Sequence, residues 1–227
     1  MKIDVLTLFP EMFEPLKASI LGKAMNKGVL TVNLINIRDF SKEKHKKTDD
    51  YPYSGGDGMV MTPQPLYDAI MSVKTEQSYV VYLSPKGTPL KQNKVKELAK
   101  LEHMVLVCGH YEGIDERIIT LLVNEQISIG DFVLTGGEIP AMALIDSVSR
   151  YITGVLGNAN STEVESFSDQ LLEYPQYTRP QTFMGLEVPS VLLSGNHKNI
   201  DAWKQQMRLE ETKRYRPDLL NKNQTEQ

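Results

Sequence analysis

The sequence is almost without cysteine and has no long apolar run. Its 227 residues include a single cysteine, Cys108, so no disulfide can form within the chain. No stretch approaches the roughly 18 consecutive apolar residues that a membrane helix needs. The first apolar run is too short for a signal peptide and carries an acid, Asp4. These absences predict a cytoplasmic protein with no membrane association.

An excess of basic charge is also missing. The chain holds 25 lysines and arginines against 29 aspartates and glutamates, a formal net charge of −4. The whole molecule therefore has no electrostatic attraction for nucleic acid, and any RNA or DNA contact must come from local patches. The length fits one large domain, or one medium domain followed by a small one.

The first two thirds of the chain alternate strand and helix patterns. Short apolar runs typical of buried strands are followed by segments with apolar residues at helical spacing. This alternation predicts an α/β fold with a mainly parallel sheet flanked by helices. The predicted strands are residues 3–9, 30–37, 79–83, 104–108 and 126–130, and the predicted helices are residues 10–27, 63–73, 91–101, 114–123 and 139–152.

The character of the sequence changes after residue 157. Residues 158–169 contain three acids, no base and few apolar residues, which predicts an exposed, mobile linker. Three prolines and a polar helix over about residues 198–214 follow, with too few strand patterns to extend the sheet. We therefore predict an α/β domain over residues 1–157, a linker over 158–170 and a small helical domain over 171–227.

Three glycine-bearing loops each follow a predicted strand, at residues 84–87, 109–117 and 129–138. Ligands of open α/β sheets sit beyond the carboxyl ends of the strands, where glycines let the backbone approach a ligand closely. Any one loop alone is more simply a strand-to-helix turn, but the three together favour a common binding site. The spacing fits neither a P-loop nor a dinucleotide fingerprint.

Other features are open to two interpretations. The glycine-dense loop SGGDGM at residues 54–59 is either a flexible surface loop or a loop that passes close to a ligand or partner. The four histidines lack the spacing of metal ligands, and Cys108 ends an apolar run, as a buried structural cysteine does. The tail offers Arg208, Lys213 and Arg214, which suit phosphate contacts or a solvated helix face equally.

Several motifs occur together in one order: GHYEGIDER at 109–117, IGDFVLTGGE at 129–138, SFSD at 166–169, YTRP at 177–180 and LSGNH at 193–197. With them the chain resembles the bacterial tRNA (guanine-N1)-methyltransferases, which methylate guanine-37. The resemblance implies a trefoil knot in the α/β domain and S-adenosylmethionine as methyl donor. It also implies a homodimer with shared active sites, binding to the anticodon region of tRNA, and a dependence on magnesium for which the sequence shows no ligand set.

The resemblance assigns residues to roles. Asp169 matches the general base and Arg150 the arginine near the target guanine. The tRNA contacts would include Ser194, His197, Arg208, Lys213 and Arg214. The donor pocket would be built by Tyr82, Leu83, Ser84, Pro85, Gly109, Tyr111, Glu112, Ile129, Gly130, Asp131, Phe132, Val133, Leu134, Gly136, Gly137 and Pro140.

These roles suit the chemistry. Guanine N1 carries a proton at neutral pH, so a carboxylate must accept it while a guanidinium stabilises the charge that develops on O6. From the residues alone, Asp169 is more simply an inert linker acid, and Arg150 complements the end of the preceding helix. The chain departs from the usual motifs at Ser54, Asp57 and Gln170.

Two other functions are open at this stage. A non-catalytic RNA-binding protein could use the basic residues of the tail, but it would not need three converging glycine loops. A nucleotide-dependent oxidoreductase would need the dinucleotide fingerprint that is missing here.

Overall fold

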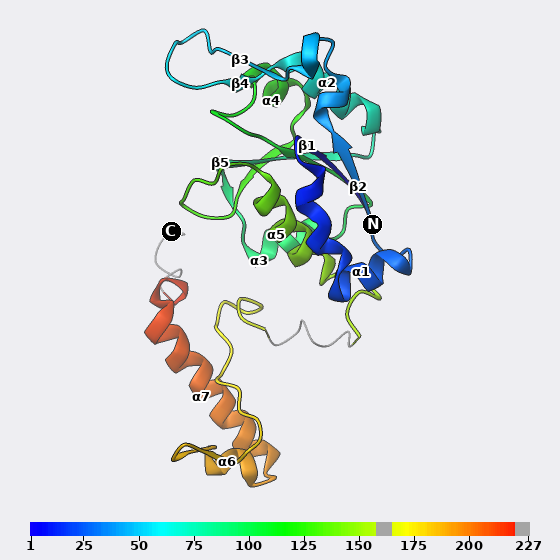
Figure 1. The fold of residues 1–227 in the computed structure, drawn as a ribbon. Coiled ribbons are helices and arrows are strands. Elements are labelled where there is room, and N and C mark those ends of the chain that lie inside the picture. The colour runs from blue at the N-terminus through cyan, green and yellow to red at the C-terminus, as the bar shows by residue number, and fades with distance from the viewer. Residues whose placement is uncertain (158–164, 221–227) are drawn as a thin grey trace. The chain divides into compact units, whose positions relative to one another are not determined.

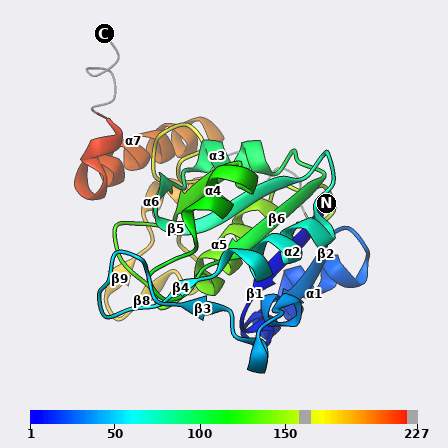
Figure 2. The ribbon, with the colours of Figure 1, turned by 90° about the horizontal axis from the view of Figure 1, so that it is seen from above.

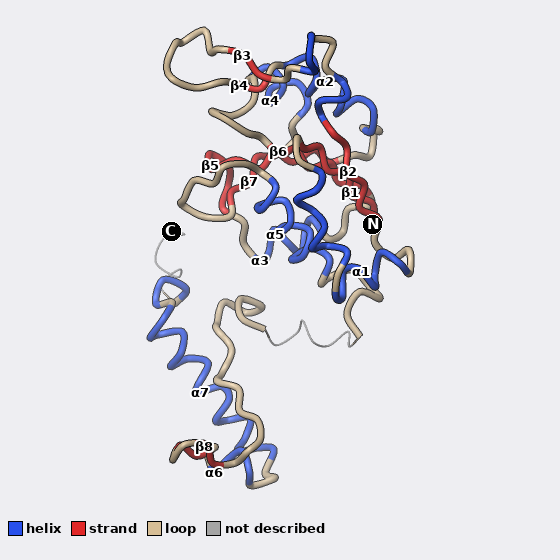
Figure 3. Tube along the Cα trace, viewed as in Figure 1, coloured by secondary structure: helices blue, strands red, loops and turns tan. Residues whose placement is uncertain are grey.

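The structure is a computed structural model that describes residues 1–157 and 165–220. The chain divides into two compact units, Met1–Ala159 and Asn160–Gln227. Figure 1 follows the chain from the N-terminus to the C-terminus, and Figure 3 separates its helices from its strands. Each unit is described by itself below.

The first unit is built on a five-stranded sheet with the order β2-β1-β6-β5-β7. Every neighbouring pair in this sheet is parallel. The α/β prediction with a mainly parallel sheet is confirmed. The strands are β1 (Lys2–Thr7), β2 (Thr31–Asn36), β5 (Tyr79–Pro89), β6 (His103–Cys108) and β7 (Glu125–Ser128). Figure 2 shows the sheet from above, and Figure 3 labels β7.

Helices cover both faces of the sheet, as a parallel sheet requires. One face carries η1 (Pro10–Lys17), α1 (Ser19–Asn26), α3 (Gln92–Leu98) and α5 (Glu138–Ser149), which enclose a core with Ile3, Leu106 and Leu144. The other face carries α2 (Pro63–Val73), α4 (Glu116–Leu122) and η2 (Ile37–Phe40). Because β6 is central and covered on both sides, all its residues are buried, which explains the unbroken apolar run over Met104–Cys108.

Two predicted elements differ from the structure. Residues 10–27 form a 3-10 helix and a separate α-helix instead of one helix, because Pro15 removes a backbone donor and Ser19 takes a positive φ of 54°. The strand predicted to end at residue 83 continues to Pro89. Its pairing with β7 skips from Leu83 to Thr88, and both of these residues pair with Ile127.

Smaller elements complete the chain. The first unit also has η3 (Lys44–Lys46) and the two-stranded ribbon of β3 (Asp49–Asp50) and β4 (Val60–Met61). The second unit contains the hairpin of β8 (Thr182–Phe183) and β9 (Leu186–Glu187), followed by α6 (Ser190–Leu193), α7 (His197–Tyr215) and η5 (Pro217–Leu219). Residues 158–164 of the predicted linker lie outside the described residues.

Candidate methyl-donor site

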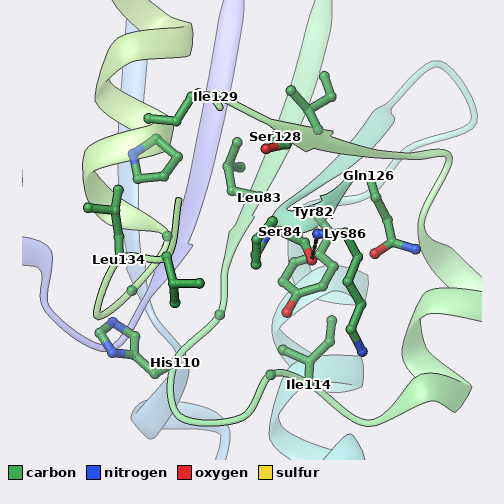
Figure 4. Close-up of a pocket in the computed structure, with 18 of the residues that line it drawn as sticks. Tyr82, Leu83, Ser84, Lys86, His110, Ile114, Gln126, Ser128, Ile129 and Leu134 are labelled. Atoms are coloured by element: carbon green, nitrogen blue, oxygen red, sulfur yellow. Dashed lines mark hydrogen bonds between the residues drawn. The ribbon is translucent and has the colours of Figure 1, made fainter. Parts of the chain in front are cut away.

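Residues of the three glycine-bearing segments enclose a pocket of about 310 Å³ beside the carboxyl ends of β6 and β7. Residues 84–87 were predicted as a loop, but they lie within β5 because this strand continues to Pro89. Figure 4 shows side chains of the three segments around the pocket. A volume of this size is at the lower end of the range for small-molecule and cofactor sites. Of the residues predicted for the donor site, all except Asp131 line the pocket. The structure therefore brings residues of all three segments together at one pocket, whereas the ligand of the pocket stays a prediction.

Two glycines are needed where the loops approach their neighbours. A Cβ on Gly109 would lie 2.8 Å from the Tyr82 ring, and a Cβ on Gly137 would lie 2.7 Å from the Cα of Cys108. The Gly137 amide also donates to the Gly109 carbonyl at 2.9 Å. Larger side chains at these positions would push the loops apart and change the shape of the pocket.

Tyr82 forms a buried part of the pocket wall and is only 5% exposed. Burial raises the pKa of its hydroxyl above the ordinary value. Tyr82 therefore stays neutral at physiological pH and presents an aromatic surface. Beside it, the Lys86 amide donates to the Ser84 hydroxyl at 3.2 Å, a bond that fixes the turn after the buried part of β5 (Figure 4).

The glycine-dense loop at residues 54–59 passes close to the pocket wall. The Glu112 amide donates to the Met59 carbonyl at 3.0 Å, and the Met61 amide donates to the Gly113 carbonyl at the same distance. A Cβ on Gly58 would lie 2.4 Å from Cγ of Glu112. This loop therefore packs against a segment that lines the pocket, which supports the second of its two interpretations.

Some pocket residues were missed by the sequence analysis. His110 stands inside a quoted motif, but the histidines were considered only as metal ligands. Glu138, which contacts His110, gave no signal because nothing in the sequence marks this acid as buried. The missed lining residues are Lys86, His110, Gly113, Ile114, Glu116, Ile119, Gln126, Ile127, Ser128 and Thr135.

Arg150 is the C-cap residue of α5, and Pro140 in the first turn of this helix lines the pocket. Ten residues separate Arg150 from Pro140, which corresponds to about 15 Å along the helix axis. This distance is more than an arginine side chain spans. The structure therefore places Arg150 at the end of α5 that is remote from the pocket of its own chain.

Asp169 and Arg208 form an ion pair in the second unit. One guanidinium nitrogen of Arg208 donates to Oδ2 of Asp169 at 2.9 Å, and the other donates to Oδ1. The Arg208 side chain is 4% exposed, whereas that of Asp169 is 54% exposed. The hydrogen bonds from Arg208 lower the pKa of the Asp169 carboxyl below its ordinary value.

Arg208 also donates to the Leu172 carbonyl at 3.3 Å. It therefore faces the segment beside α7 and is not part of an exposed basic patch, contrary to the interpretation of the tail as a solvated patch. The other residues predicted to contact tRNA, namely Ser194, His197, Lys213 and Arg214, are exposed.

Cys108 is buried, and burial raises the pKa of its thiol well above the ordinary value. This agrees with a structural role. Residues 1–157 and 165–220 contain no group of three or more histidines, cysteines and acids that could hold a metal ion, so these residues offer magnesium no such ligand set. No helix in the same residues is long and apolar enough to cross a membrane.

Comparison with known proteins points in one direction. The sequence pattern of the family described as tRNA (Guanine-1)-methyltransferase TrmD matches residues 1–222. A tRNA (guanine-N(1)-)-methyltransferase of Caldanaerobacter subterraneus is 61% identical over 100% of this chain and 95% of its own. Proteins of the same name from Carboxydothermus hydrogenoformans and Staphylococcus aureus are 57% and 54% identical, over 97% and 98% of this chain and 87% and 91% of theirs. The chain belongs to the tRNA (guanine-N1)-methyltransferase family.

Proposed function

We propose that the protein transfers a methyl group from S-adenosylmethionine to N1 of guanine-37 in tRNA, and that it does so in the cytoplasm. The observation that carries this proposal is the pocket beside β5 and the carboxyl ends of β6 and β7 in a chain of this family. The trefoil knot of the fold is part of the same proposal and rests on family membership.

The pocket residues suit the proposed donor. Gly109, Gly136 and Gly137 bring backbone groups to the surface of the pocket, while Tyr82 and Leu134 offer apolar area to an adenine ring. When bound, S-adenosylmethionine supplies an electrophilic methyl group on a sulfonium. The protein's part at this pocket is to hold the donor and to exclude water from it.

The acceptor needs a base and a cation. Guanine N1 must lose its proton as the methyl group arrives, and the negative charge that then develops on O6 needs a donor. We assign the cation to Arg150 and the base to a carboxylate of the segment 165–169. The sequence motif names Asp169 as this base.

The ion pair with Arg208 sets a condition on that assignment. A carboxylate with a lowered pKa, bound at both oxygens by a guanidinium, is a weak proton acceptor. Asp169 must therefore exchange Arg208 for the guanine when tRNA binds. Glu165, the other acid of this segment, is the alternative, and a comparison of the two residues decides which one accepts the proton.

The position of Arg150 supports a homodimer with shared active sites. Since Arg150 lies about 15 Å along α5 from Pro140, it is suited to the pocket of a second copy rather than its own. A mixing experiment tests this. A Gly109→Val chain has a blocked pocket and an intact Arg150, and an Arg150→Ala chain has the reverse. Mixed dimers of the two regain one working site only if the site is shared.

Random mixing makes half of the dimers mixed, so about a quarter of the wild-type activity should return. If the mixture stays as inactive as its two components, each chain uses its own Arg150 and the shared site is refuted. Sedimentation at the assay concentration checks that the protein is a dimer.

We assign tRNA binding in the second unit to Ser194, His197, Lys213 and Arg214, which are exposed, and exclude Arg208 from direct phosphate contact. The direct test of the function uses purified protein, labelled S-adenosylmethionine and tRNA transcripts. A transcript with guanine at position 37 should become labelled at N1, and a transcript with adenine there should not. Binding of tRNA without methyl transfer would instead identify a non-catalytic RNA-binding protein.

A further inference from the structure

Two buried histidine–carboxylate pairs lie at opposite ends of the parallel strands: one at the carboxyl edge, where the strands end, and one at the amino edge, where they begin. At the carboxyl edge, Nε2 of His110 lies 2.9 and 2.8 Å from the two carboxylate oxygens of Glu138. At the amino edge, Nε2 of His103 lies 2.8 Å from Oδ2 of Asp4. The side chains of His110 and Glu138 are 12% and 1% exposed, and those of His103 and Asp4 are 10% and 1% exposed. Only His110, which lines the pocket, belongs to the proposed donor site.

Glu138 joins three segments that end at the carboxyl edge. It is the first residue of α5, it accepts a hydrogen bond from the hydroxyl of Thr7 at 2.6 Å, and it binds His110 from the loop after β6. The His110 ring also packs edge-to-face on the Phe9 ring, with centroids 4.9 Å apart. A single carboxylate therefore fixes the end of β1, the loop at residues 109–113 and the start of α5 relative to one another.

The His110–Glu138 pair also explains why position 136, in the pocket wall, is a glycine. A Cβ on Gly136 would lie 2.2 Å from Cε1 of His110 and 2.5 Å from Oε2 of Glu138. Gly136 and His110 also form an isolated antiparallel bridge. The loop at residues 129–137 therefore lies directly against the His110–Glu138 pair, and the shape of the pocket at this point depends on it.

We infer that Glu138 is a positioning residue for the methyl donor, which acts through His110 to hold the loops at residues 109–113 and 129–137 in their binding arrangement. This inference rests on the proposed function, since it concerns the same pocket. Glu138 need not line the cavity or touch the reacting atoms, because it is buried behind His110 and acts through it. Its role resembles that of the outer residues that orient the ligands of a metal site.

The test is calorimetry of S-adenosylmethionine binding to the full-length protein. Glu138→Gln keeps the size of the side chain but removes the charge that binds Nε2–H of His110. Affinity for S-adenosylmethionine should fall about 10- to 100-fold, the scale expected when a small displacement misplaces a bound group. In steady-state assays, KM for the donor should rise more than kcat falls.

The pair at the amino edge is the matched control. Asp4→Asn disrupts a histidine–carboxylate contact of the same length and burial, so it should lower the melting temperature yet leave the affinity for S-adenosylmethionine unchanged. A second route uses His110. His110→Ala should weaken donor binding as Glu138→Gln does, and His110→Gln, which can still donate to the carboxylate, should restore part of it. The double variant should be no worse than the more impaired single variant.

The binding measurements distinguish failure of the proposed function from failure of the inference about Glu138. If the wild-type protein does not bind S-adenosylmethionine, the proposed function fails and this inference fails with it. If the wild-type protein binds the donor, and Glu138→Gln and His110→Ala bind it as tightly as Asp4→Asn does, the inference alone is refuted. Should Glu138→Gln not fold, the two His110 variants decide between these outcomes.

Discussion

Replacement of Asp169 by asparagine should destabilise the second unit, and it also tests whether Asp169 is the general base. The substitution removes the charge that binds Arg208, whose side chain is 4% exposed. Breaking a fully buried ion pair costs roughly 3–5 kcal/mol. Because the Asp169 side chain is 54% exposed, water compensates part of this loss, and we expect about 1–3 kcal/mol.

The chain carries its own reporter for this unit. Trp203, the single tryptophan, lies in α7 and packs on Tyr174 and Tyr177, with ring centroids 6.3 Å apart in both cases. Its fluorescence should follow unfolding of the second unit directly. With a slope of about 1–3 kcal/mol per molar urea, the midpoint for Asp169→Asn should move down by roughly 1 M.

The pH dependence gives an independent check. The pKa of Asp169 is lowered in the folded protein from 3.8, so the ion pair stabilises the fold at every pH above 3.8. This contribution disappears as the pH falls through the lowered pKa. The difference in stability between wild type and Asp169→Asn should therefore be constant at higher pH and should shrink below 3.8. An unchanged urea midpoint near neutral pH would refute the structural role of the pair.

Turnover is then measured where both proteins are folded. If Asp169 is the general base, kcat of Asp169→Asn should fall about 10²- to 10⁴-fold while affinity for S-adenosylmethionine barely changes. Glu165→Gln is the matched control because it removes the other charge of the segment. If Glu165→Gln is the inactive variant and Asp169→Asn keeps near-normal turnover, the base is Glu165 and Asp169 only anchors the segment to α7.

Three further predictions concern other parts of the chain. Gly137→Ala places a Cβ 2.7 Å from the Cα of Cys108, which should lower the free energy of unfolding by about 1–3 kcal/mol. Calorimetry should also show loss of S-adenosylmethionine binding. An unchanged affinity for S-adenosylmethionine would contradict the proposed position of the donor site. Burial raises the pKa of Asp4, but hydrogen bonds from Lys2, Asn33 and His103 lower it by more, so its pKa in the folded protein lies below 3.8. The stabilisation by Asp4 should therefore fade below pH 3.8 in thermal melts. A contribution that grows below this pH would contradict the lowered pKa. Neutralising Lys213 and Arg214 should weaken tRNA binding and reduce its salt slope by about 1 per lost phosphate contact, and an unchanged slope would exclude them as contacts.

The elements of the sheet could be predicted because burial leaves a direct trace in the sequence. β6 is covered on both faces, so all its residues after His103 are apolar. The break in the helix at residues 10–27 was missed although Pro15 is visible in the sequence, because a serine carries no local sign of the positive φ that Ser19 adopts. The continuation of β5 to Pro89 was missed for a related reason. It depends on Gly87, where a Cβ would lie 2.5 Å from the backbone of Gln126.

The site was predicted unevenly. The glycine loops were found because close backbone approach restricts those positions to one residue type. His110 and Glu138 were missed because a histidine and an acid 28 residues apart have no local pattern that joins them. Arg208 was predicted as a tRNA contact or as part of a solvated helix face. Its burial was not foreseen because its partner, Asp169, lies 39 residues earlier in the sequence and outside the helix. Pairs of this kind become visible only when the fold brings the two segments together.

The charged groups of this protein include exposed groups that face solvent and buried groups that hold segments of the fold together. The exposed pairs Lys17–Glu14 and Lys47–Asp50 contribute little, because water screens them. Glu138 differs, since a carboxylate with 1% exposure is tolerated only where donors such as Thr7 and His110 compensate for its lost hydration. Because both donors must point at the carboxylate, the positions of Thr7 and His110 are fixed together with that of Glu138. The buried carboxylate of Glu138 is therefore expected to set the shape of the proposed donor pocket. The pair at the opposite edge does not line that pocket, so it measures how much of the effect is stability alone.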